Sequence, residues 1–98
     1  MNTQALMQQA QRMQKDLQKK QEELGKMEFE GSSEWVTVVL TGNKEMVKFN
    51  IKKITLDEDD IEMLEDMIKI AYNDALKKVE KAYDEKLGAY GKQLNGLI

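Results

Sequence analysis

The side chains that most often perform catalysis are absent from this sequence of 98 residues. It contains no Cys and no His, which excludes a thiolate nucleophile, a disulfide framework, an imidazole general base and a Cys/His zinc site. The densest chemically capable cluster is the acidic run at residues 57–60. A calcium loop needs oxygen ligands at alternate positions followed by Gly, and the series Asp57, Asp59, Ile61 fails at its third member. No nucleophile motif or phosphate-cradling Gly loop accompanies these acids, so we expect no catalytic residues, no metal and no cofactor.

A second set of polar side chains is suited to anions. Gln8, Arg12, Lys15 and Lys19 are spaced by four, three and four residues, which places them on one face of a helix. Arg and Lys in such a stripe can contact phosphates, while Gln8 and Gln11 can reach sugar oxygens or base edges. A helix face rich in Lys and Gln is also how a long helix stays soluble. Both interpretations are open at this point.

The N-terminal segment is predicted to be a long amphipathic helix over about residues 2–25. It contains no Pro and one Gly, with Thr3 as the expected N-cap and Gly25 as the expected stop. Its apolar residues follow heptad spacing, interrupted by one polar member, on the side opposite the basic stripe. This seam consists of Leu6, Ala10, Met13, Leu17, Lys20, Leu24 and Met27.

The middle of the chain has the period of two that is typical of strands, predicted at about residues 27–31, 34–41 and 44–51. A two-residue turn at Gly42-Asn43 would place Val38 opposite Val47, and Val36 opposite Phe49. A turn around Ser32-Ser33 would place Phe29 opposite Val36 and Met27 opposite Val38. Both turns put the apolar residues on one face, namely Met27, Phe29, Val36, Val38, Leu40, Val47, Phe49 and Ile51.

A second helix is predicted at about residues 58–87, capped by Asp57 or Asp59 and followed by a flexible tail at 88–98. Apolar residues recur along it at helical spacing. The fold class is therefore α+β in one domain, residues 1–98, with the order helix, three-stranded antiparallel meander, helix (α-β-β-β-α). Both helices are longer than the strands, so we expect them to protrude as arms. A small sheet with open edges favours a homodimer.

The charge of the chain is unevenly distributed. The net charge of -3 taken alone disfavours a nucleic-acid partner. Residues 1–21, however, carry four cations and one acid, and residues 75–98 carry five Lys and three acids, while residues 22–74 carry 6 Lys and 14 acids. The expected arms are thus positive and the body negative. The apolar stretch at 35–40, interrupted by Thr37, is far shorter than the roughly 20 residues of a membrane span, so no membrane partner is expected.

Several segments together resemble the YbaB/EbfC family of bacterial nucleoid-associated proteins. They are MQQAQRMQ at 7–14, QKKQEEL at 18–24, the Glu30-Gly31 step, residues 38–42, MLED at 63–66 and NDA at 73–75. The resemblance covers nearly the whole chain. It implies a cytoplasmic homodimer on the bacterial nucleoid that packs through its sheets, binds double-stranded DNA between tweezer-like arms and influences nucleoid organisation or gene expression.

The resemblance also assigns candidate DNA-binding residues, position by position, to the two helices. They are Gln8, Arg12, Lys15, Lys19 and Lys20 in the first helix, and Lys77, Lys78, Lys81 and Lys86 in the second. The tail departs from the family pattern because it lacks Pro. The single Arg limits bidentate contacts to guanine, so contacts to the DNA backbone should dominate, and no small-molecule substrate is expected.

Two other functions remain open. A protein-interaction or chaperone-like module could clamp a polypeptide through Met7, Met13 and Leu17 without direct DNA binding. A small scaffolding subunit of a DNA-processing complex is the third. Exposed apolar residues at the arm tips would favour the clamp.

Overall fold

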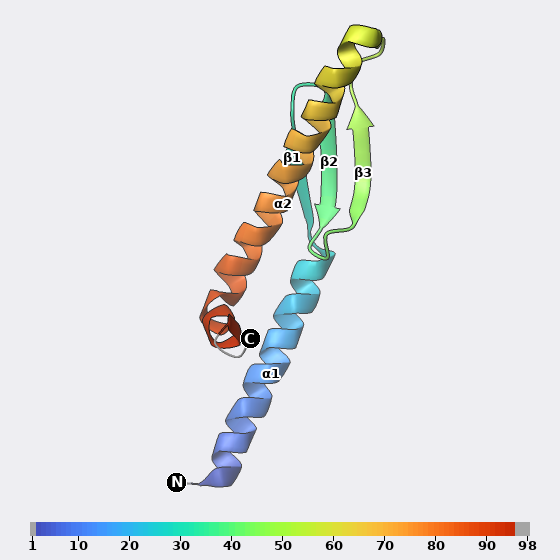
Figure 1. Ribbon diagram of the computed structural model, residues 1–98. Helices are drawn as coiled ribbons and strands as arrows, with labels where there is room; N and C mark the ends of the chain where they lie inside the picture. The colour runs from blue at the N-terminus through green and yellow to red at the C-terminus, as the bar shows by residue number, and fades with distance from the viewer. Residues whose placement is uncertain (1, 96–98) are drawn as a thin grey trace.

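The computed structural model describes the backbone of residues 2–95 and the side chains of residues 2–88. The protein is elongated, with extents of 71 × 23 × 16 Å. The predicted α+β order is confirmed (Figure 1). Helix α1 is followed by three strands in the sheet order β1-β2-β3, and then by helix α2. The elements are α1 (Thr3–Lys26), β1 (Glu28–Ser32), β2 (Val36–Thr41), β3 (Met46–Ile51) and α2 (Glu58–Asn95).

Helix α1 has the predicted length but not the predicted ends. The N-cap is Asn2 rather than Thr3, because the Asn2 side-chain oxygen accepts a hydrogen bond from the Gln4 N–H at 3.1 Å. Gly25 lies inside the helix and does not stop it, and the Met27 N–H closes the last turn on the Leu24 carbonyl at 3.1 Å. Gly25 does not adopt the left-handed conformation of a glycine cap. Its lack of a side chain instead makes room for the loop between β2 and β3.

The predicted two-residue turn between β2 and β3 is wrong. The loop has three residues, 42–44, because the Thr41 N–H donates to the Glu45 carbonyl at 2.8 Å, and Lys44 adopts a positive φ of 66°. Three-residue loops that end in a left-handed residue are common in hairpins.

The β2-β3 register is consequently shifted from the predicted one. Val38 pairs with Phe49, and Val36 pairs with Ile51. A bulge between Val39 and Leu40 removes Val47 from the ladder. Because the shift at Val36 and Val38 is two residues, these valines keep the predicted face.

The predicted turn at Ser32-Ser33 is also wrong. The chain reverses between Ser33 and Val36. The Ser33 N–H donates to the Val36 carbonyl at 2.9 Å, and the Val36 N–H donates to the Ser33 carbonyl at 3.3 Å. Phe29 therefore pairs with Leu40, not Val36, and Met27 precedes the ladder. This shift is four residues, and an even shift leaves each side chain on its predicted face.

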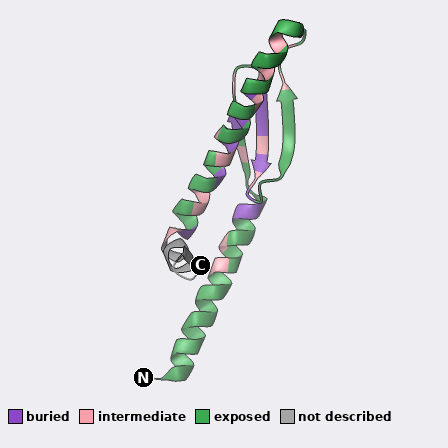
Figure 2. Ribbon diagram, viewed as in Figure 1, coloured by how far each residue is buried: buried purple, intermediate pink, exposed green. Residues whose placement is uncertain are grey.

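The core lies between α2 and the first two strands. Val36, Val38 and Leu40 of β2 are fully buried against a stripe of α2 that is partly made of small residues, Met67, Ala71, Ala75 and Val79. Within the described residues, α2 packs on β1 and β2 and leaves β3 largely uncovered, with only Ile51 of β3 packed against the core. Figure 2 shows the result, with β2 largely buried and β3 exposed.

Helix α2 is longer than predicted. It continues through Gly88 to Asn95 instead of ending near Leu87, and the last three positions of the predicted flexible tail, 96–98, lie outside the described residues. The N-terminal half of α1 projects beyond the sheet and beyond the end of α2 (Figure 1). In the described part of the chain, no helix is long and apolar enough to cross a membrane.

Candidate nucleic-acid interface

The predicted basic stripe lies on the projecting part of α1. Gln8, Arg12, Lys15 and Lys19 are all exposed to solvent, and Figure 2 shows that the N-terminal half of α1 is exposed. The ion pairs of the described residues leave Arg12, Lys15 and Lys19 without an acidic partner within 4.0 Å. Their positive charge is therefore available to a phosphate or another anion.

Lys20 differs from the other α1 cations. It is half-buried, as its place in the apolar seam predicts, and its ammonium lies 3.3 Å from the Asp16 carboxylate one turn earlier. This neighbour partly neutralises Lys20. The stripe that faces solvent is thus made by the other three cations and Gln8.

The α2 lysines lie in a different environment. The Lys78 ammonium donates to the Glu30 carbonyl of β1 at 2.6 Å and lies 3.7 Å from the Asp74 carboxylate. Lys77 is exposed beside the same part of β1. Further along α2, Lys81 lies 3.9 Å from Glu85, and Lys86 contacts the Met27 sulfur at 3.7 Å. Lys78 of α2 is therefore held against β1, away from the projecting part of α1.

The acidic run caps α2 at the opposite end of the molecule from the start of α1 (Figure 1). The Asp57 N–H donates to the Asp60 carboxylate at 3.1 Å, and the Lys53 ammonium lies 3.0 Å from the same carboxylate. These two contacts hold the pKa of Asp60 below its ordinary value. Lys53 also stacks 4.0 Å from the centre of the Trp35 ring. The acids of this turn thus stabilise the start of α2, and Asp60 links it to Lys53 in the segment that follows β3.

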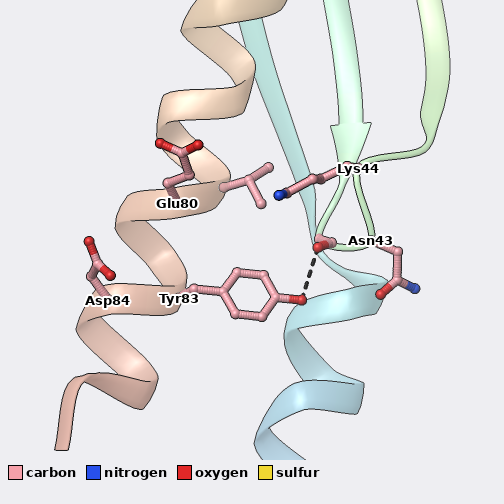
Figure 3. A pocket seen from close by; sticks show the side chains of 7 residues that line it. Asn43, Lys44, Glu80, Tyr83 and Asp84 are labelled. Carbon is pink, nitrogen blue, oxygen red and sulfur yellow. Dashed lines mark hydrogen bonds between the residues drawn. The ribbon is translucent and has the colours of Figure 1, made fainter. Parts of the chain in front are cut away.

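The hairpin loop 42–44 joins the two helices to the sheet. The Tyr83 hydroxyl of α2 donates to the Gly42 carbonyl at 2.9 Å, and the Gly42 N–H donates to the Met27 carbonyl at the end of α1 at 3.0 Å. A Cβ on Gly42 would overlap the Leu24 carbonyl, so only Gly fits there. Figure 3 shows the hollow of about 410 Å³ between this loop and α2, with Glu80 and Asp84 on its helical side.

A second hollow lies where the loop meets α1, and sequence reasoning did not identify it. It has a volume of about 460 Å³ and is lined by Gln18, Gln21, Glu22, Gly25, Lys26 and Asn43. The only signal in the sequence was the pair of glycines, Gly25 and Gly42, which was interpreted as a helix stop and a turn. Both glycines instead allow α1 and the loop to approach closely.

Comparison with known proteins finds similarity over nearly the whole chain. The profile of the YbaB/EbfC DNA-binding family matches residues 1–94. A protein of Ligilactobacillus salivarius named as a nucleoid-associated protein is 39% identical over 99 residues, covering 99% of this chain and 95% of that protein. Nucleoid-associated proteins of Streptococcus pyogenes serotypes M5 and M3 are each 41% identical over 96 residues, covering 96% of this chain and 97% of each relative.

Proposed function

Because the chain belongs to the YbaB/EbfC DNA-binding family, we propose that it is a non-enzymatic, nucleoid-associated homodimer that binds double-stranded DNA through its helical arms in the cytoplasm. The observation that carries this proposal is the stripe on the projecting part of α1, where Arg12, Lys15 and Lys19 are exposed and have no acidic partner within 4.0 Å among the residues that the structure describes. Lys20 and the α2 lysines Lys77, Lys78, Lys81 and Lys86 belong to the proposed interface as secondary contacts, because Lys20, Lys78 and Lys81 each lie beside an acid that offsets their charge.

The stripe has dimensions suited to a duplex. From Gln8 to Lys19 it extends roughly 17 Å at about 1.5 Å per residue. That length corresponds to roughly five base pairs at about 3.4 Å each. Three cations on one arm supply few phosphate contacts, so a single arm binds weakly. The interaction is therefore expected to be salt-sensitive and to need both arms of a dimer.

Strand β3 supports the homodimer. It is an edge strand that α2 does not cover, and it exposes apolar side chains, with Val47 51% and Phe49 44% accessible. Monomeric proteins rarely leave a flat apolar edge open. Beside Val39 and Val47, the sheet carries Glu28 and Glu30 at one side and Lys48 at the other. A two-fold axis through this face would bring the acids of one copy to the Lys48 of the other.

A mobility-shift titration of a mixed-sequence duplex across salt concentrations tests the proposal. Wild type should bind tightly at low salt and lose affinity steeply as salt rises, because phosphate contacts release counterions. Arg12→Glu with Lys19→Glu should abolish the shift. The matched control is Lys52→Glu with Lys69→Glu, which makes the same charge change at exposed positions outside α1. Equal binding by both double variants would reject the α1 stripe as the DNA-binding face.

The chaperone-like clamp is retained as a second candidate because apolar residues at the arm tip are exposed. Leu6 is 48% and Met7 63% accessible on the projecting part of α1. Such a clamp would hold a polypeptide by apolar contact, so its complexes should survive high salt, which DNA complexes do not. Suppression of the aggregation of an unfolded test protein in about 0.5 M salt, where the Debye length is only about 4 Å, and its loss in Met7→Ser with Met13→Ser, would support it.

A further inference from the structure

The second hollow continues the basic stripe of α1. Lys15, Lys19, Glu22 and Lys26 are spaced by four, three and four residues, so they follow the same line along the helix as Arg12. Glu22 and Lys26 line the hollow itself. A duplex that lies along the stripe towards the sheet therefore reaches the hollow at the base of the arm.

Amide side chains dominate the lining of this hollow. Gln18 and Gln21 of α1 and Asn43 of the hairpin loop face one space of about 460 Å³. In the described part of the chain, no hydrogen bond engages these three side-chain amides. An amide presents a donor and an acceptor in one plane, which matches the N6 and N7 atoms of adenine, whereas lysines contact phosphates without reading sequence.

Asn43 is held more firmly than the two glutamines. Its backbone N–H donates to the Thr41 hydroxyl at 3.3 Å. The neighbouring Gly42 is bonded to Met27 of α1 and to Tyr83 of α2, and the Lys44 N–H bonds the Thr41 carbonyl at 2.9 Å. A short side chain on a loop fixed from three sides loses little conformational entropy when it binds a base.

We propose that this hollow is the base-reading part of the DNA interface, and that Asn43 is the residue that gives it a preference for adenine. The inference rests on the proposed function. Two neighbouring surfaces then have different roles. Arg12, Lys15 and Lys19 supply sequence-independent affinity, and the amides of the hollow discriminate between bases.

Gly25 offers a way to displace the Asn43 amide without changing it. A Cβ at position 25 would lie 2.9 Å from the Asn43 Oδ1 atom, too close for the amide to stay. Because the clash is with the end of a side chain, Asn43 can rotate away at little cost, and Ala is a better helix former than Gly. Gly25→Ala should therefore move the amide while leaving the fold as stable as wild type or more so.

The test is selection from a random duplex pool, followed by competition titrations of the selected duplex against one in which each enriched adenine is replaced. Wild type should select adenine at one or more fixed positions and prefer that duplex by about fivefold or more. Asn43→Ala and Gly25→Ala should lose this preference while keeping the salt dependence of wild type. Two controls should retain it: Gln9→Ala, an amide of α1 outside the hollow, and Gly88→Ala, a helical glycine with open space around it.

The outcomes separate the two proposals. An unchanged preference in Asn43→Ala, or a wild type that binds every duplex equally, would overturn the base-reading role while leaving DNA binding intact. A loss of affinity in Asn43→Ala that is equal for all duplexes would also overturn it, because a structural role of the loop predicts that pattern. A wild type that binds no duplex at low salt would instead reject the proposed function itself, and the base-reading role with it.

Discussion

At the scale of single residues, Gly31 of β1 lies directly against the backbone of α2. A Cβ at this position would overlap the Ala71 carbonyl and the Ala75 backbone nitrogen. Because these are backbone atoms of a helix that packs along β1 and β2, they cannot move locally. Gly31→Ala should lower the free energy of unfolding by about 1–3 kcal/mol through overpacking.

Urea unfolding at a fixed protein concentration measures this effect as a lower midpoint with an unchanged slope. Gly88→Ala is the control, because nothing lies within 4 Å of a Cβ at that position. It should be neutral or stabilising, since Ala favours a helix. A Gly31→Ala variant as stable as wild type would mean that β1 does not pack on α2 closely enough to exclude a Cβ at position 31.

Asp60 makes the stability of the helix start dependent on pH. Its pKa is lowered in the folded protein by the Asp57 N–H and by Lys53. A lowered folded-state pKa means that ionised Asp60 stabilises the fold above its unfolded-state pKa, and that this contribution is lost as the pH falls through the folded-state value. Asp60→Asn should therefore melt below wild type at pH 7, and the difference should shrink below about pH 4.

Thermal unfolding across pH, followed by circular dichroism, measures this difference. Glu65→Gln is the matched control, because Glu65 is exposed on α2 and makes no ion pair within 4.0 Å among the described residues. Its difference from wild type should be small throughout the pH range. A difference for Asp60→Asn that persists at pH 2 would show that the carboxylate charge is not its origin.

At the scale of elements, α1 has two unlike halves. Its C-terminal end is anchored, since Leu24 is fully buried and Gly25 lies under the hairpin loop. Its N-terminal half is exposed and is held by its own helical hydrogen bonds and the Asn2 cap. Removing that cap should loosen the arm without unfolding the body, because stability is local where tertiary contacts are few.

Asn2→Ala should therefore speed hydrogen exchange in the first two turns of α1 by about fivefold, which corresponds to a cap contribution of about 1 kcal/mol. The urea midpoint of the whole protein should be unchanged. Asn2→Ser retains a capping oxygen and should exchange like wild type. A fall in the urea midpoint of Asn2→Ala would show instead that the arm unfolds together with the core.

The sequence predicted the elements and the buried face better than the connections. Side chains alternate between the two faces of a strand, so a register shifted by an even number of residues keeps every side chain on the same face. Val36 and Val38 were therefore assigned to the correct face although both predicted turns were wrong. The turns depend on tertiary contacts: Gly42 packs on Leu24 and bonds Tyr83, which no local pattern reveals. For the same reason the stripe on α1 was predictable from spacing within one helix. The amide hollow was not, because it combines α1 with Asn43 from a distant loop.

At the scale of the whole molecule, the net charge of -3 is a poor guide to the partner. Arg12, Lys15 and Lys19, which make no ion pair with the described residues, lie on the projecting arm, and the acidic run caps α2 at the far end of a molecule 71 Å long. At physiological salt, charges further apart than about 8 Å are largely screened from each other. A polyanion at the arm therefore encounters the local positive charge rather than the sum over the chain.

The number of arms in the assembly depends on dimerisation, because each chain contributes one α1 arm. If β3 forms the interface, a carboxylate at Val47 would be buried there without a partner, which costs several kcal/mol. Val47→Glu should therefore raise the dimer dissociation constant at least about tenfold. Sedimentation equilibrium measures this change. Ile70→Glu is the matched control, because Ile70 is 57% exposed on α2 beside β1, away from β3.

A dissociated chain has one arm instead of two, so the loss of the dimer should also change how DNA binding depends on salt. With half the phosphate contacts, the slope of log affinity against log salt should fall to about half, since it is proportional to the number of neutralised phosphates. Val47→Glu should show this halved slope at concentrations where it is monomeric, and Ile70→Glu should keep the slope of wild type. If Ile70→Glu dissociates and Val47→Glu remains a dimer, the interface lies on α2 and β3 faces solvent in the assembly.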